Sequence, residues 1–301
     1  MKLLIIYDDK SKENAQKLFD ALHKEKNASI NASMIEIFYI PKKIKDADVF
    51  FETLHCATHF VAFYSEMSDS FFYAAGVAAE GKKQFFCFST ENTKMNPFFF
   101  KKTKVYNNFD EILELCKKQL DEYPKKEAIK KAKAELLKQG VAVTKESFIS
   151  AVQTGNIEWC QLFLNADFSV NTQDIKGVPL LCLAARAAKI ESIEFLLKNN
   201  SDVNLCSADR GNTAIVDAAL GKQSGIIALL LAHNANPNIK NKDGQTALII
   251  SVGLSDAAAV GYLLKAGADV DSTDSLGVSA RKYAAMFKNE TILALLEKYK
   301  K

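Results

Sequence analysis

The chain has 301 residues, of which 48% are hydrophobic and 25% charged, and this composition is typical of a globular protein long enough for two compact domains. The 39 Lys and Arg residues nearly balance the 36 Asp and Glu residues, so a formal net charge of +3 makes nucleic acid an unfavourable partner. The six cysteines include no C-x-x-C pair, which argues against a zinc ribbon or a disulfide framework and favours a reducing, cytoplasmic setting.

Residues 1–123 alternate between short apolar runs and amphipathic stretches. The first apolar run, at 3–7, is followed by Asp8 and Asp9 and is too short for a signal sequence or a membrane span, so we interpret it as a strand. We expect strands at 2–8, 33–40, 59–65, 84–89 and 104–108, and helices near 11–26, 46–56, 69–81 and 109–123. Apolar strands that alternate with helices predict an α/β domain with a parallel sheet covered on both faces, in a flavodoxin-like arrangement.

The stretch GVAAEGKK, at 76–83, has the glycine and lysine spacing of a phosphate-binding loop. Such a loop leaves a strand and opens a helix, so that backbone N–H groups face the anion. Here the predicted helix precedes the stretch and a strand follows it. We therefore interpret Gly81 as a helix C-cap, with Lys82 and Lys83 complementing the negative end of the helix dipole.

The segment FVAFYSEMSDSFFYAAGVAAEGKKQFFCFS, at 60–89, is similar to Toll/interleukin-receptor-like (TIR-like) domains and to nucleoside deoxyribosyltransferases. The opening LLIIYDDKSKENAQKLFDAL, at 3–22, also resembles TIR-like proteins. In those families the glutamate two positions before the helix glycine is the catalytic carboxylate, and here that position is Ala74. A methyl group can neither act as a nucleophile nor stabilise an oxocarbenium ion, so the resemblance implies a domain that has lost this chemistry. Glu80 lies on a different face of the predicted helix from Ala74 and is a poor substitute.

Polar side chains follow two predicted strands at the edge where open α/β sheets bind ligands. They are Asp8, Asp9, Ser65, Ser68, Asp69 and Ser70. Ser68 to Ser70 are also ordinary N-cap residues, so both capping and a nucleotide-type ligand remain open. The alternative to an inactive domain is an enzyme that cleaves or transfers NAD or nucleoside N-glycosidic bonds with the carboxylate of Asp69 or Glu66.

His55 and His59 have an H-x-x-x-H spacing, but no glutamate stands beside the first histidine. We interpret both as packing or surface residues and expect no metal. No cofactor is expected either.

A lysine-rich stretch, at 124–143, joins the two halves. Ile129, Ala132 and Leu136 recur at helical spacing up to Gly140, which predicts a helix that caps the second half and turns its lysines to solvent.

Residues 144–301 contain an internal repeat, because segments 176–204, 210–238 and 243–271 realign with one another. The glycines that open the units, Gly177, Gly211, Gly244 and Gly277, are separated by 34, 33 and 33 residues. Together with GQTAL, YLLKAGADVD, FLLKNNSDVN and LLLAHNANPN, this pattern resembles the ankyrin repeat. With an earlier unit at 146–171 and the last one, we expect about five repeats, each a pair of helices that must stack to bury its apolar face.

Two features of the units are specific. Gly267, Asn200, Asn234 and Asp167 occupy a helix C-cap that needs positive φ. In the last unit, Arg281 and Lys282 replace inner apolar residues, as a solvent-facing end requires.

The ankyrin resemblance implies a scaffold or adaptor that binds another protein through its concave face and the fingertips between repeats. The residues expected on the concave face are Gln153, Thr154, Arg186, Ala187, Leu220, Leu254 and Met286. This series turns apolar toward the C-terminus and predicts a partner with an apolar anchor over repeats three to five. The alternative is that these residues pack between neighbouring helices. An extra residue between Asn204 and Gly211 enlarges one fingertip, which carries Asp209 and Arg210, and Lys242 lies at the next.

Overall fold

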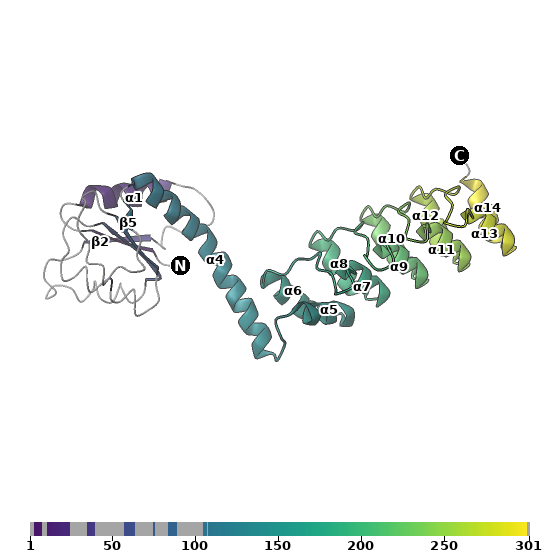
Figure 1. The fold of residues 1–301 in the computed structure, drawn as a ribbon, viewed down its shortest axis with the longest axis horizontal. Coiled ribbons are helices and arrows are strands. Elements are labelled where there is room, and N and C mark those ends of the chain that lie inside the picture. The colour runs from purple at the N-terminus through teal and green to yellow at the C-terminus, as the bar shows by residue number, and fades with distance from the viewer. Residues whose placement is uncertain are drawn as a thin grey trace. The chain divides into compact units, whose positions relative to one another are not determined.

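The computed structural model describes residues 3–7, 11–24, 35–39, 57–63, 75, 84–88, 105–106 and 108–299 (Figure 1). The chain divides into two compact units, Met1–Glu127 and Ala128–Lys301.

The first unit contains a five-stranded sheet of β1 (Leu3–Tyr7), β2 (Ile35–Tyr39), β3 (His59–Phe63), β4 (Gln84–Phe88) and β5 (Val105–Tyr106), in the order β2-β1-β3-β4-β5. All neighbouring strands are parallel, which confirms the predicted parallel sheet. Successive residues of the central strands β1 and β3 are buried, among them Leu4, Ile5, Phe60 and Val61. Burial of both faces explains why these strands are continuous apolar runs rather than alternating ones.

Helix α1 (Lys12–Lys24) packs on this sheet through Ala15, Leu18 and Leu22, which are buried at helical spacing. Ile112 and Cys116 of α4 (Phe109–Lys138) belong to the same core. The predicted helix at 46–56 lies outside the described residues, and of the one predicted at 69–81 only Ala75 is described, as helical.

Helix α4 is one continuous helix, where the sequence predicted two helices separated at Pro124. A proline inside a helix removes one backbone hydrogen bond without necessarily ending the helix. The helix is followed by Gly140, which has a φ of 76°, and Val141 N donates to Leu136 O over 2.9 Å in a Schellman-type closure. Ala132 and Leu136 are buried in the core of the second unit, as their spacing predicted.

The second unit contains five helix pairs, which confirms the predicted repeats. They are α5 (Lys145–Thr154) and α6 (Ile157–Asn165), α7 (Leu180–Arg186) and α8 (Ile190–Lys198), α9 (Ala214–Leu220) and α10 (Ser224–Ala232), α11 (Ala247–Gly253) and α12 (Ala257–Lys265), and α13 (Ala280–Met286) and α14 (Glu290–Lys298). The first helices of successive repeats contact one another in one row, and the second helices lie in another row (Figure 1). We call the loop before each first helix a finger; the fingers of repeats two to five are residues 173–179, 207–213, 241–246 and 273–279.

The predicted positive φ angles at the helix ends are confirmed. They are 73° at Asp167, 61° at Asn200, 64° at Asn234 and 84° at Gly267. A second series was not predicted and lies in the turn between the two helices of each repeat. It comprises Gly155, Ala188, Lys222, Ser255 and Lys288, with φ between 51° and 82°.

In the last repeat, Arg281 and Lys282 of α13 stand at the positions that Leu181 and Cys182 occupy in α7. Leu181 and Cys182 are buried, whereas Lys282 is exposed, so the polar end that the sequence predicted is present.

Candidate protein-binding surface

Backbone hydrogen bonds join each finger to the next. Ala208 N donates to Gly177 O over 2.8 Å, Lys242 N to Arg210 O over 3.0 Å, and Ser275 N to Asp243 O over 3.0 Å. The fingers of repeats two to five therefore form one continuous edge.

Three of the four fingers are tight turns held by an Asp or Asn side chain, and in the finger of repeat three Ser207 Oγ accepts from Asn212 N over 3.1 Å. Asp174 Oδ1 accepts from Lys176 N and Val178 N, both over 2.8 Å, and Asp274 and Asn241 make equivalent bonds in their own fingers. Gly177 has a φ of 71°, and a Cβ atom there would lie 2.5 Å from Ala208 Cβ. Glycine is required at this position both for the turn and for the close approach of the next finger.

A polar cluster joins repeats two, three and four. Arg186, at the end of α7, donates from Nε to Asp217 Oδ2 over 2.9 Å and forms a bidentate pair with Asp209 over 2.9 and 3.3 Å. Asn212 Nδ2 donates to Asp217 Oδ1 over 2.7 Å and its Oδ1 accepts from Asn241 Nδ2 over 3.2 Å. Burial raises the pKa of Asp217, against the opposing effects of Asn212 and Arg186, whereas the hydrogen bonds from Arg186 lower the pKa of Asp209.

Several residues that were predicted to contact a partner belong to this cluster or lie beside it. Arg186 and Asp209 bond to each other, so the end of a first helix and the tip of the next finger share one face. Lys242 Nζ donates to the carbonyl oxygens of Ala208 over 2.6 Å and Asp209 over 3.0 Å and supports the enlarged fingertip. Arg210 is exposed beside them. Contact between a partner and these residues stays a prediction.

The apolar residues of the series are not all equivalent. The last residue of the first helix is Arg186, Leu220, Gly253 and Met286 in repeats two to five, so Leu254 belongs one position later. Leu220 is 44% and Met286 68% exposed, whereas Leu254 is half-buried and packs against the core. Leu254 is thus equivalent to Ala187, which was also in the predicted series, and its contact with a partner stays a prediction.

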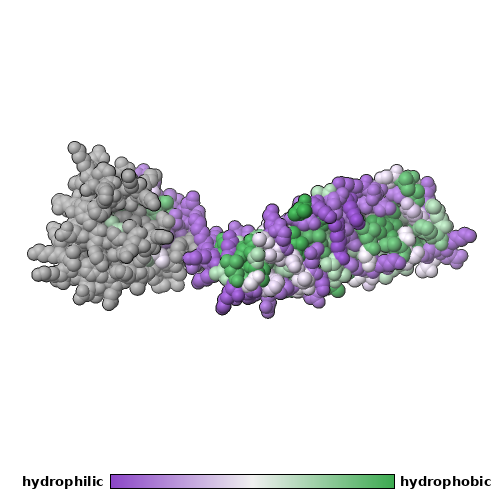
Figure 2. Space-filling model, turned by 60° about the horizontal axis from the view of Figure 1, so that its bottom comes forward, coloured by the Kyte–Doolittle hydropathy of each residue, from purple (hydrophilic) through white to green (hydrophobic). Residues whose placement is uncertain are grey.

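Three exposed apolar residues in the fingers and in the turn after a first helix were missed: Phe287, which follows Met286, and the finger residues Ile175 and Leu276. Leu276 is 81% exposed. For Ile175 and Leu276 the signal was an apolar residue within two positions of the finger glycine, Gly177 or Gly277, where a polar one is expected. Figure 2 shows the hydrophobic residues of the repeats in separate areas bordered by hydrophilic ones.

A second ladder joins the repeats at the ends of the second helices. Asn171 Oδ1 accepts from Asp202 N over 2.9 Å, Asn204 Oδ1 from Asn236 N over 2.8 Å, and Asn238 Oδ1 from Asp269 N over 2.8 Å. This ladder was also missed, although its asparagines recur at the repeat period. It fixes the spacing of neighbouring repeats.

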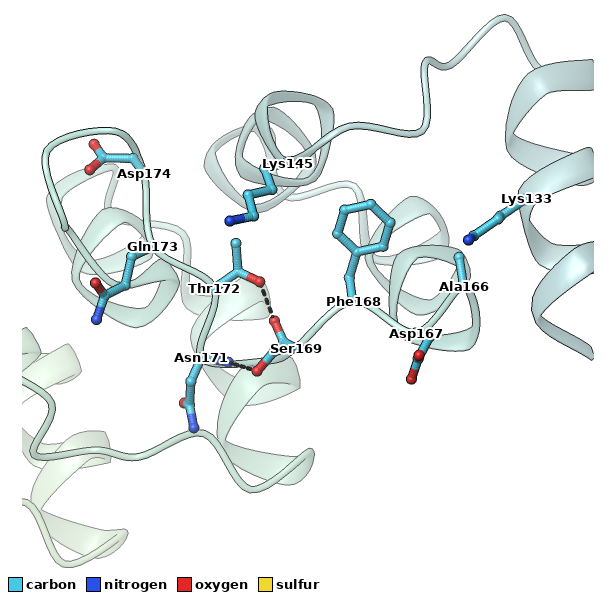
Figure 3. A pocket seen from close by; sticks show the side chains of 10 residues that line it. All are labelled: Lys133, Lys145, Ala166, Asp167, Phe168, Ser169, Asn171, Thr172, Gln173 and Asp174. Carbon is cyan, nitrogen blue, oxygen red and sulfur yellow. Dashed lines mark hydrogen bonds between the residues drawn. The ribbon is translucent and has the colours of Figure 1, made fainter. Parts of the chain in front are cut away.

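An open pocket of about 680 Å³ lies beside repeat one, between Lys133 of α4, Lys145 of α5 and the turn from Ala166 to Asp174 (Figure 3). Phe168 points into it, and the turn is held by Thr172 Oγ1, which donates to Ser169 O over 2.6 Å. Two lysines and two aspartates line it, so its charge is mixed. Thr172 is the most buried of its polar side chains. We assign this pocket no ligand.

The predicted ligand-binding residues of the first unit, Asp8, Asp9, Ser65, Ser68, Asp69 and Ser70, lie outside the described residues, as do Glu66, Ala74, His55 and the stretch 76–83. Tyr7, which ends β1, lies opposite Phe63, which ends β3.

His59 is 2% exposed on β3, and its Nδ1 lies 3.0 Å from Thr58 Oγ1. Burial lowers the pKa of His59 to about 4. Within the described ranges, no group of three or more His, Cys, Asp or Glu side chains is arranged to hold a metal ion.

Comparison with known proteins agrees with the helix pairs and fingers. Residues 148–241 and 221–301 match the family model for ankyrin repeats (3 copies), which together span more than half of the chain, so the chain belongs to the ankyrin-repeat family. A Treponema pallidum (strain Nichols) protein described as ankyrin repeat-containing is 36% identical over 165 residues, or 55% of each chain. The neurogenic locus notch homolog protein 1 of Xenopus laevis is 32% identical over 129 residues, 42% of this chain and 5% of that protein. The chain thus spans about half of the length of the first relative and a small part of the second.

Among the described helices, none is both long enough and apolar enough to cross a bilayer.

Proposed function

We propose that the protein is a scaffold or adaptor that binds a partner protein through the fingers and first helices of its repeats. The observation that carries this proposal is the bond between Arg186 and Asp209, because it joins a first-helix end and a fingertip into one surface. Leu220 and Met286 hold the position of Arg186 in repeats three and five and are exposed, as is Phe287, which follows Met286. Exposed apolar side chains grouped on one face are typical of protein interaction sites.

Packing between neighbouring helices, the competing explanation, suits Leu254, since it is half-buried against the core. Leu220 and Met286 leave much of their surface in solvent, which supports contact with a partner.

A pull-down with the full chain tests this function. Leu220→Glu and Met286→Glu place charges at the ends of first helices, whereas Ile190→Glu and Tyr262→Glu place them on exposed apolar residues of the second helices. We expect the first pair to lose the captured partner and the second pair to keep it. Equal capture by all four variants would show that the surface is not used.

For the first unit we propose a TIR-like, flavodoxin-like domain with a nucleotide-type pocket that is catalytically inactive. The strand order β2-β1-β3-β4-β5 is that of flavodoxin-like domains, which bind ligands where the order reverses, beyond the ends of β1 and β3. Asp8 and Asp9 follow β1 in the chain, and Ser65 follows β3 after one residue. Ala74, in the position of the catalytic glutamate, is the reason to expect no turnover.

The enzymatic alternative uses Asp69 or Glu66 to cleave an N-glycosidic bond. Incubation of the full chain with NAD and with nucleosides, followed by measurement of released base, separates the two. Release that is abolished by Asp69→Ala or Glu66→Ala would replace the inactive domain with an enzyme.

The organisation that accompanies this function is a domain at 1–123, a capping segment at 124–143 and repeats at 144–301. We also propose a reducing, cytoplasmic compartment, because Cys87, Cys116, Cys160 and Cys182 are buried free thiols.

A further inference from the structure

The last residue of the first helix in repeat two contacts the repeat that follows it. Arg186 in repeat two reaches Asp217 on the next first helix and Asp209 on the next finger. In repeats three and five the same position holds Leu220 and Met286, which offer apolar side chains to solvent.

Repeat four interrupts this row, because the equivalent residue is Gly253. A Cβ atom built on Gly253 would meet no atom within 4 Å, so the space in front of it is open. The row of first helices therefore has a gap between Leu220 and Met286 that one side chain from a partner can fill.

An aromatic residue holds the position in repeat five that Asp217 holds in repeat three. Asp217, which Arg186 covers, is the fourth residue of α9, and the fourth residue of α13 is Tyr283. Tyr283 stacks on Phe287 with ring centroids 6.0 Å apart and donates its hydroxyl to Asp274 Oδ2 over 2.7 Å. Its hydroxyl is thus occupied and its ring is held in place, which suits contact with an apolar side chain.

The same surface carries more basic than acidic residues. The fingers and first helices of repeats three to five, residues 207–222, 241–255 and 273–288, carry six basic and four acidic residues. Three of the four carboxylates already accept hydrogen bonds within the fold: Asp209, Asp217 and Asp274. Asp243 is exposed and is the exception.

The basic side chains, in contrast, remain available. Among the described residues, Arg210, Lys222 and Lys288 have no ion-pair partner, and Lys282 makes only a long bond of 3.5 Å to Gly277 O. Lys222 and Lys288 each lie two positions after an exposed apolar residue, Leu220 and Met286. The surface therefore places positive charge beside its apolar side chains.

We propose that this surface binds a partner segment that carries one apolar side chain flanked by acidic residues, with the apolar side chain seated in the gap at Gly253. The assignment rests on the proposed function and specifies its partner. Acidic side chains of the segment pair with Lys222, Lys288 and Arg210, and such exposed pairs supply orientation and on-rate as well as affinity.

Selection of phage-displayed random peptides on the immobilised full chain tests the proposal. We expect the enriched peptides to carry Asp or Glu on both sides of Leu, Phe or Met, and their binding to weaken as salt is raised. Gly253→Gln fills the gap and is expected to weaken these peptides about tenfold or more, whereas Gly261→Gln on α12, where the space is equally open, leaves binding unchanged.

A charge reversal supplies the second arm. Lys222→Glu with Lys288→Glu is expected to weaken binding about fivefold to tenfold. Lys198→Glu with Lys265→Glu, at the ends of the second helices, changes the net charge equally and is expected to have little effect.

The outcomes separate the two levels of the proposal. Enrichment of basic or uncharged peptides that Gly253→Gln still blocks would overturn the acidic partner and leave the binding function standing. Peptides whose binding neither Gly253→Gln nor the Lys222 and Lys288 reversal changes would overturn both.

Discussion

Arg186 and Asp217 connect two neighbouring repeats through a bond of 2.9 Å between Nε and Oδ2, and the carboxylate of Asp217 is buried. The positions equivalent to Asp217 hold Leu183 and Ile250 in repeats two and four, so the stack tolerates an apolar residue there. Among repeats two to five, only repeat three has a carboxylate at this position.

We expect substitutions of Arg186 and of Asp217 to lower the free energy of unfolding by different amounts. Arg186→Leu leaves a buried carboxylate with only Asn212 and should lower the free energy of unfolding by about 3 kcal/mol. Asp217→Ile leaves Arg186 paired with Asp209 and removes a carboxylate whose pKa is raised because its partners do not fully offset its burial. It also leaves the buried Nδ2 of Asn212 without its acceptor, so it should lower the free energy of unfolding by about 1–2 kcal/mol. Urea unfolding followed by circular dichroism measures both. A larger loss for Asp217→Ile than for Arg186→Leu would contradict the account.

We expect replacement of Ala188 by glycine to stabilise the protein. Its φ of 54° lies in the left-handed region, which costs a non-glycine residue about 1–2 kcal/mol. Ala188→Gly should therefore raise the free energy of unfolding by about 1 kcal/mol. The matched control is Ala187→Gly, at a φ of −84°, which should lower it by about 0.5–1 kcal/mol. Thermal unfolding of the two variants gives the comparison, and destabilisation by Ala188→Gly would refute the strain.

The asparagine ladder offers a test of repeat spacing. Asn238→Ala leaves the N–H of Asp269 without its acceptor and should cost about 1 kcal/mol. Asp271 holds the equivalent position in the next repeat and forms no further rung among the described residues, so Asp271→Ala serves as the control and should cost little. Hydrogen exchange at the amide of Asp269 should become faster only in Asn238→Ala. If the amide of Asp269 exchanges at the same rate in both variants, the ladder does not fix the spacing of the repeats.

The first unit is expected to lose stability in mild acid because of His59. Its pKa is about 4 in the folded chain and about 6.5 in the unfolded chain. The unfolded state therefore binds the extra proton first, so stability is full above about pH 6.5 and falls by up to about 3 kcal/mol as the pH drops toward 4. NMR titration of the imidazole signals, with His59→Gln to assign the resonance, measures this pKa. A midpoint between about pH 6 and 7 would exclude the burial effect.

Much of this fold could be predicted from the sequence, for reasons that particular residues show. The repeat period, the glycines such as Gly177 and the leucine stripes recur in several copies, so their meaning does not depend on distant contacts. The parallel sheet followed from apolar runs such as Leu3–Tyr7. The continuity of α4 through Pro124 did not follow, because local preference favours a break there.

The candidate surface was harder to predict. Arg186 was predicted to lie on the concave face and Asp209 on an enlarged fingertip, but nothing in their sequence separation indicates that they bond to each other. Gly253 was not predicted as part of the surface, because a glycine in a helix has no side chain that indicates a contact. Its role in the proposed site follows from its equivalence to Leu220 and Met286 in the neighbouring repeats. Such relationships depend on tertiary packing.

The central claim is that partners bind the fingers and first helices, and site-specific photo-crosslinking tests it most directly. A photo-reactive amino acid is placed in the full chain at Leu220 or Met286 and, for comparison, at Ile190 or Tyr262, which are exposed on the second helices. We predict covalent adducts with a partner protein from the first two positions and none from the other two. Adducts from Ile190 or Tyr262, with none from Leu220 or Met286, would contradict the claim.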